Sequence, residues 1–213
     1  MAEENIDELL DEKIKPLIKE ATTKLLGVTV DELTEDITAK LSRSPLLEFP
    51  IDTSLKFKEA KKRFKRAYLE KMLQVHLGNI SEVARYADID RRSIHRLIKS
   101  LKISITKIKK DLIKPYDIKR SAVSHAIEGV LDLYKGVLHP KKLKSMYQGV
   151  TELSDNLLKE LPEQRMTLKE AEEEFEKSYF KKALKENNNI SKTAKKIGLR
   201  YETLHRKIKS LNL

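Results

Sequence analysis

The chain has 213 residues and no cysteine, and its 44 Lys and Arg residues exceed its 33 Asp and Glu residues, giving a formal net charge of +11. This surplus predicts an anionic partner such as nucleic acid, and the lack of cysteine fits a reducing cytoplasm. The N-terminus is acidic and no apolar run approaches ~20 residues, so the sequence predicts neither a signal peptide nor a membrane span.

The charge is distributed unevenly along the chain. Residues 1–55 hold 6 basic and 13 acidic residues, a net charge of −7. Residues 56–103 hold 14 against 5, net +9, and residues 164–213 hold 13 against 7, net +6. Positive charge is concentrated in two segments, as binding to phosphate requires. Membrane binding would need a free apolar face opposite the basic one. In these segments the apolar face is needed to form the core, so no membrane partner is expected.

The first predicted element is an amphipathic helix within residues 5–26. Its apolar face is formed, at helical spacing, by Ile14, Leu17, Ile18, Ala21 and Leu25. A second helix is expected to begin at Asp31. Within residues 121–135 the same spacing is formed by Val123, Ala126, Ile127, Val130 and Tyr134. Pro140 suits the first turn of the helix that follows, so the two stretches predict a duplicated pair of helices.

Residues 79–101 and 189–211 form a clear internal repeat. They read NISEVARYADIDRRSIHRLIKSL and NISKTAKKIGLRYETLHRKIKSL. Each predicts two short helices that cross closely at a small residue, Ala84 or Ala194. The turn between them favours a residue that tolerates positive φ, and Gly198 and Asp88 meet this need. The pattern is that of a helix-turn-helix, which places its second helix in the DNA major groove.

The outward face of each second helix carries candidate DNA-binding residues. At helical spacing these are Arg92, Ser93, Arg96 and Lys99, and then Thr203, Arg206 and Lys209. The shared opening of the two repeats adds Asn79, Ser81, Asn189 and Ser191. One such face is compatible with a solvated surface helix, but its recurrence at the same spacing favours DNA binding.

The helix before each repeat also recurs. FKEAKKRFKRAYLEKML corresponds to LKEAEEEFEKSYFKKAL, so that Phe64 matches Phe175 and Tyr68 matches Tyr179. Together with the repeats, these segments resemble Fis-type DNA-binding domains, as found at the C-terminus of NtrC- and NtrX-like enhancer-binding regulators. The resemblance covers residues 54–103 and 165–213. It implies a helical domain that dimerises through its leading helices and presents a C-terminal helix-turn-helix.

The resemblance also implies roles for the residues that open each recognition helix, which in the family touch bases and phosphates. Carried over to this chain, they are Arg91, Ser93 and Arg96, and Arg200, Thr203 and Arg206. The second copy departs from the first, with Tyr201 in place of Arg91 and Lys207 in place of Leu97, and both of these residues are also candidates for DNA binding. Asp90 is expected to cap the first recognition helix, with a contact to cytosine as the alternative. The two helices are therefore expected to prefer different half-sites.

The leading helices differ in charge, which bears on assembly. The first carries Lys61, Lys62, Arg63, Lys65 and Arg66, and the second carries Glu170, Glu172, Glu173, Glu174 and Glu176. Opposite charge favours pairing of one copy with the other. Such pairing is compatible with a homodimer, slightly favoured here because residues 104–163 look helical and separate the copies, or with an intramolecular pseudo-dimer.

Catalytic motifs are lacking. The six glycines are scattered, no phosphate-cradling loop is present, and the five histidines are dispersed, so neither an enzyme, a metal site nor a cofactor is expected. An ATPase module and a receiver domain are not expected either. Acid–base chemistry at Glu172, Glu173 and Glu174 is less plausible than a helix face.

The sequence therefore predicts an all-α protein of tandem duplicated helical units, each ending in a Fis-type helix-turn-helix. Its expected segments are 1–53, a helical region; 54–104, the first helix-turn-helix domain; 105–163, a linker and second helical region; and 164–213, the second helix-turn-helix domain. We expect a cytoplasmic, nucleoid-associated regulator that binds double-stranded DNA and acts by site occupancy or DNA bending. The alternatives are an architectural nucleoid protein, and an interaction protein that pairs with and antagonises a full-length Fis- or NtrC-like activator.

Overall fold

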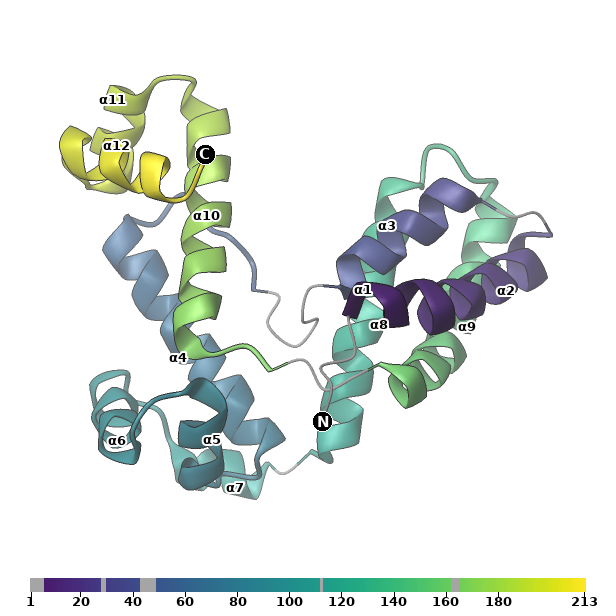
Figure 1. Ribbon diagram of the computed structural model, residues 1–213, viewed down its shortest axis with the longest axis horizontal. Helices are drawn as coiled ribbons and strands as arrows, with labels where there is room; N and C mark the ends of the chain where they lie inside the picture. Colours follow the sequence, from purple (N-terminus) through teal and green to yellow (C-terminus); the bar gives the residue numbers. More distant parts are fainter. Residues whose placement is uncertain (1–5, 28–29, 43–48, 112, 162–164) are drawn as a thin grey trace. The chain divides into compact units, whose positions relative to one another are not determined.

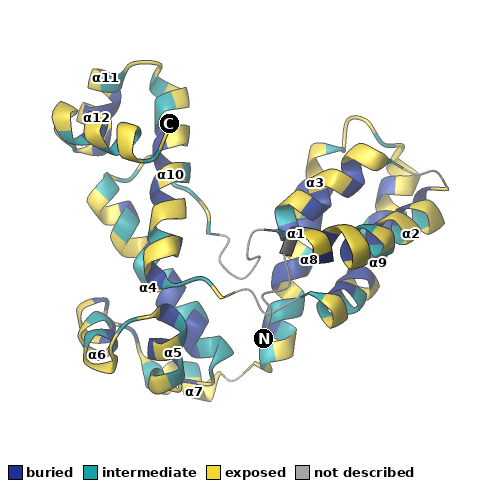
Figure 2. Ribbon diagram, viewed as in Figure 1, coloured by how far each residue is buried: buried dark blue, intermediate teal, exposed yellow. Residues whose placement is uncertain are grey.

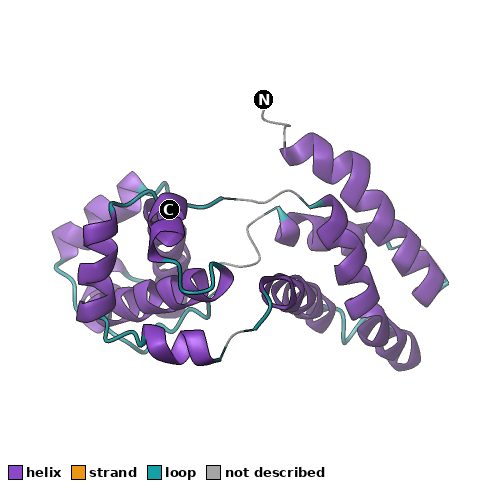
Figure 3. Ribbon diagram, turned by 90° about the horizontal axis from the view of Figure 1, so that it is seen from below, coloured by secondary structure: helices purple, strands orange, loops and turns teal. Residues whose placement is uncertain are grey.

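The computed structural model describes residues 6–27, 30–42, 49–111, 113–161 and 165–213 (Figure 1). All regular elements in these ranges are helices, as the sequence predicts (Figure 3). The chain divides into two compact units, each built from two separate stretches. Unit 1 comprises Met1–Glu48 and Ile113–Gln164, and unit 2 comprises Phe49–Leu112 and Arg165–Leu213.

Unit 1 is a four-helix arrangement extended at its N-terminus. Its elements are α1 (Ile6–Leu9), the π-helical turn η1 (Leu10–Ile14), α2 (Lys15–Leu26), α3 (Asp31–Leu41), α8 (Pro115–Leu133) and α9 (Pro140–Glu160). Helix α9 packs against α2 and α8, and α3 packs against the same two helices. The four helices thus enclose one apolar core (Figure 2).

The apolar spacing read from the sequence forms this core. Ile14 and Ile18 are fully buried on the N-terminal side, and Val123 and Ile127 are buried on α8. Pro140 occupies the first turn of α9, as predicted, because that position needs no backbone N–H donor. Helices α8 and α9 therefore pack with the N-terminal helices and do not separate the leading helices.

Unit 2 contains the segments predicted to bind DNA. Its elements are α4 (Phe57–Val75), α5 (Ile80–Ala87), α6 (Arg91–Ser100), α7 (Ile105–Lys110), α10 (Leu168–Asn187), α11 (Ile190–Ile197) and α12 (Tyr201–Ser210). The two leading helices, α4 and α10, pack against each other. Each is followed by a pair of short helices, α5 with α6 and α11 with α12.

Candidate nucleic-acid interface

An aromatic cluster joins the two leading helices of unit 2. The rings of Phe64 and Phe175 are stacked with their centroids 4.5 Å apart, and those of Phe57 and Phe180 are 4.8 Å apart. The start of α4 therefore lies beside the end of α10, so the two helices are antiparallel. Because each short helix pair follows the C-terminal end of its leading helix, the two pairs lie at opposite ends of unit 2 (Figure 1).

Two buried tyrosines make corresponding contacts across this interface. The Tyr68 hydroxyl donates to the backbone oxygen of Met166 at 2.9 Å, and the Tyr179 hydroxyl donates to that of Leu55 at 2.6 Å. The two hydrogen bonds join corresponding residues of the two halves, because Tyr68 matches Tyr179 and Leu55 matches Met166 in the aligned sequences. Burial raises the pKa of Tyr179 to about 12, so its hydroxyl stays protonated and able to donate.

Ion pairs of the kind expected from the charge difference also cross the interface. Lys61 Nζ lies 2.6 Å from a Glu176 carboxylate oxygen and 2.8 Å from Glu172, and Lys65 Nζ lies 2.7 Å from Glu172. The Glu176 side chain is only 5% exposed. Burial opposes its ionisation, but hydrogen bonds from Lys207 and Lys61 outweigh this effect and hold the pKa of the Glu176 carboxyl below its usual range. Opposite charge thus accompanies aromatic packing where α4 meets α10.

The two short helix pairs share their helix lengths, the caps of their first helices and the conformation of their turns. Helices α5 and α11 have 8 residues each, and α6 and α12 have 10 each. Asn79 and Asn189 cap α5 and α11 by accepting backbone N–H bonds, which satisfies donors that the first turn leaves free. The turns contain Asp88 at φ +55° and Gly198 at φ +72°, so the predicted left-handed positions are confirmed.

The apolar positions of the two pairs are likewise as the spacing predicts. Ala84 and Ala194 are buried, and Ile94 and Leu204 are fully buried. An alanine permits the close approach of two helices, and the two larger residues anchor each second helix to the first. The two pairs therefore correspond in their buried small residue, their apolar anchor and their left-handed turn.

The comparison with known families addresses the second pair. Residues 172–211 match the model of the Fis family of bacterial regulatory proteins. The match spans most of α10 and all of α11 and α12, so α11 and α12 form a Fis-type helix-turn-helix, an element that binds double-stranded DNA. Helices α5 and α6 lie outside the matched residues. No curated protein and no solved structure was found to match the chain.

The structure exposes most of the side chains predicted to contact DNA. On α6 and at its matching positions on α12, the exposed members are Arg91, Arg92, Arg96, Lys99, Tyr201, Arg206 and Lys209. Arg200 precedes α12 and is also exposed, as are Ser81 and Ser191. Thr203 is half-buried. The exposed cationic groups therefore line one face of α6 and one face of α12.

Other candidate residues bind groups within unit 2. Asp90 caps α6 by accepting from Arg92 N at 3.2 Å, and the Ser93 hydroxyl donates to the same carboxylate at 2.6 Å. The Ser93 hydrogen bond holds the pKa of the Asp90 carboxyl below its usual range. Lys207 donates to Glu176 at 2.5 Å, so its ammonium is directed toward α10. The capping role expected for Asp90 is confirmed, and Lys207 has a partner that the sequence did not indicate.

One contact near the interface could not be read from the sequence. The Arg165 guanidinium donates to the backbone oxygens of Arg85 at 2.5 Å and Tyr86 at 3.1 Å, at the end of α5. A cation suits the carbonyl end of a helix. Arg165 and α5 are far apart in the sequence, so no local pattern joins them.

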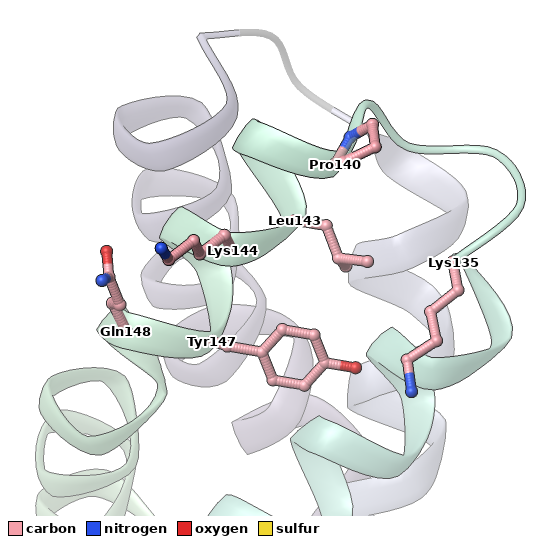
Figure 4. Close-up of a pocket in the computed structure, with 6 residues that line it drawn as sticks. All are labelled: Lys135, Pro140, Leu143, Lys144, Tyr147 and Gln148. Carbon is pink, nitrogen blue, oxygen red and sulfur yellow. The ribbon is translucent and has the colours of Figure 1, made fainter.

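Unit 1 offers little to compare with this interface. A hollow of about 420 Å³ is lined by Lys135, Pro140, Leu143, Lys144, Tyr147 and Gln148 (Figure 4). Its Tyr147 hydroxyl donates to Asp132, and Lys135 Nζ lies 2.8 Å from the same carboxylate, so these two groups are already bound. Among the described residues there is no cluster of metal-ligating side chains. None of the helices described is long and apolar enough to cross a membrane.

Proposed function

We propose that the chain is a transcriptional regulator that binds double-stranded DNA through two Fis-type helix-turn-helix motifs, α5–α6 and α11–α12. The observation that carries the proposal is the exposed basic face of the second helix in each pair, and the family match of α11–α12 supports it. The equal helix lengths, the asparagine caps of α5 and α11 and the left-handed turns of the two pairs support a tandem duplication. The proposed protein is cytoplasmic, binds no cofactor and acts by occupying its site.

The division of charge supports this assignment of roles. Unit 2 contains 30 Lys and Arg residues against 14 Asp and Glu residues, net +16, whereas unit 1 contains 14 against 19, net −5. DNA phosphates attract unit 2 and repel unit 1. We therefore assign DNA binding to unit 2 alone.

We further propose that unit 2 acts as an intramolecular pseudo-dimer. Pairing of α4 with α10 within one chain supplies the two helix-turn-helix motifs that a dimeric reader takes from two chains. Helix α4 has 19 residues, about 28 Å at ~1.5 Å per residue, and the motifs follow opposite ends of the helix pair. Dimeric helix-turn-helix proteins read half-sites about one DNA turn apart, ~34 Å. The length of the leading helices is suited to that spacing.

The test is a binding titration of the full chain on sites found by footprinting it on genomic DNA of its source. Arg96→Ala and Arg206→Ala are each expected to weaken binding by ~1–3 kcal/mol, because a base-contacting arginine contributes about that much. The first substitution is expected to cost more, since Arg91 and Arg92 make α6 the more basic helix. Lys24→Ala in unit 1 removes one exposed positive charge and serves as the control.

The outcomes separate the remaining functions. If one arginine substitution leaves affinity unchanged, that copy is a scaffold and not a reader. An equal affinity for footprinted and unrelated DNA would favour an architectural nucleoid protein. The third candidate function, an interaction protein that antagonises a full-length activator, is disfavoured because α4 and α10 already cover each other. Unchanged DNA binding after both arginine substitutions would favour this function again.

A further inference from the structure

The two recognition helices end alike and begin differently. His95, Arg96 and Lys99 of α6 have identical counterparts in α12, and all of these side chains are exposed. At the first two helical positions, however, Arg91 and Arg92 of α6 are replaced by Tyr201 and Glu202 of α12. These four side chains are also exposed. The difference therefore lies at the end of the helix that enters the groove and touches base edges in helix-turn-helix proteins.

The surroundings of these residues increase the difference. Asp90 caps α6 and holds the Ser93 hydroxyl, which leaves the two arginines as the exposed donors at the tip of that helix. In α12 the Tyr201 ring stacks on His205, with centroids 5.9 Å apart and an interplanar angle of 21°. Tyr201 is 47% exposed, so its side chain remains open to a ligand. One tip is thus cationic, and the other combines an aromatic ring with a carboxylate.

These tips suit different bases. Arginine donates two hydrogen bonds to guanine in the major groove, whereas glutamate accepts one from the amino group of cytosine. An apolar or aromatic surface contacts the methyl group of thymine. Arg96 and Arg206, which are shared, would read a common position in both half-sites.

The pairing of the leading helices prevents the two tips from becoming equivalent. Two copies of α4 paired with each other would bring Lys61 and Lys65 against a second Lys61 and Lys65. Two copies of α10 would likewise bring Glu172 and Glu176 together. Pairing of α4 with α10 avoids both repulsions and forms the observed ion pairs. Unit 2 therefore presents one tip of each kind.

We infer that unit 2 reads a non-palindromic DNA site in a single orientation, with Arg91 and Arg92 selecting one half-site and Tyr201 and Glu202 selecting the other. The inference rests on the proposed function, because it requires that both helices enter the major groove. It adds which residues make the half-sites differ. A binding site of this kind fixes the direction in which the protein sits on the DNA.

The experiment is selection of duplexes from a randomised double-stranded DNA library by the full chain. The wild-type chain is expected to enrich two unlike half-sites that share the position read by Arg96 and Arg206. Tyr201→Arg/Glu202→Arg is expected to turn the second half-site into an inverted copy of the first. The wild type should bind a duplex with two copies of the first half-site about 10-fold more weakly than its own site, and the variant should reverse that order.

Control and contrary outcomes are distinct. Glu173→Arg/Glu174→Arg adds comparable positive charge at exposed positions of α10 and should raise affinity without changing the selected sequence. Circular dichroism checks that each variant keeps its helices. A palindromic wild-type site, or a variant that selects the wild-type site, overturns the inference and leaves the proposed function intact. Enrichment of no sequence overturns both.

Discussion

The two halves of unit 2 both contain a leading helix followed by two short helices, to which the first half adds α7, but they hold these helices by different polar contacts. Helix α10 begins with a capping box, in which the Thr167 and Glu170 side chains each bond the other's backbone N–H. At the matching position of α4, Lys56 makes no side-chain capping bond within the described chain. The recognition helices show the reverse, because Asp90 caps α6 while the described residues provide no side-chain cap for α12 at Arg200.

A different contact secures α12. Lys207 binds the buried carboxylate of Glu176, and its counterpart in α6 is the apolar Leu97. The first recognition helix is thus held by a cap and apolar packing, and the second by an ion pair to its leading helix. The comparison teaches that the two halves share their buried apolar positions and the left-handed conformation of their turns, while their polar contacts differ. Three predictions test this difference.

The largest effect is expected from reversing the charge of α10 at the interface. Glu172→Lys/Glu176→Lys should destabilise unit 2 by ~3–5 kcal/mol, because Lys61, Lys65 and Lys207 lose their partners and meet like charges. The measurement is urea unfolding followed by circular dichroism. Glu173→Lys/Glu174→Lys, at exposed positions, should stay within about 0.5 kcal/mol of the wild type.

The same experiment includes a rescue. Adding Lys61→Glu/Lys65→Glu to the reversed chain should restore part of the lost stability, since the pairs re-form with exchanged signs. A rescue variant less stable than the reversed chain would contradict the assignment of these ion pairs to the α4–α10 interface.

A smaller effect is expected at the start of the leading helices. Thr167→Ala should cost about 1 kcal/mol of stability, because it removes the side-chain acceptor of the cap. Lys56→Thr should stabilise α4 by up to about 1 kcal/mol, since Glu59 lies where Glu170 lies in the capping box of α10. Lys58→Thr is the matched control within the first turn. Equal stability of Lys56→Thr and Lys58→Thr would show that the missing cap does not distinguish the halves.

The smallest effect is expected in the pH dependence of stability, and it is measured in acid. The pKa of Glu176 is lowered in the folded protein, so ionisation of this carboxyl contributes stability above its unfolded pKa, about 4.3. That contribution is lost as pH falls through the lower folded value. Glu176→Gln should therefore show a shallower loss of stability below about pH 4.5 than the wild type. Urea midpoints measured across this range test it, with exposed Glu173→Gln as the control; parallel curves for Glu176→Gln and wild type would contradict it.

The sequence by itself determined the helices, the turns and the exposed faces of the helix-turn-helix segments. These depend on local rules: apolar residues at helical spacing, Asp88 and Gly198 in left-handed turns, and Asp90 before a helix. The buried Ala84 and Ala194 follow from the same spacing. The opposite charge of the leading helices also correctly indicated that one copy faces the other.

Only the tertiary structure decided which distant segments meet. Lys61 and Glu176 lie 115 residues apart in the chain, and Arg165 caps a helix 80 residues away. Amphipathic patterns do not specify partners over such separations, because many apolar faces satisfy the same burial requirement. The sequence therefore left open whether α4 pairs within the chain or between chains, and it placed Lys207 on the DNA-binding face. The fold brings Lys207 of α12 beside α10, where its ammonium donates to the buried carboxylate of Glu176.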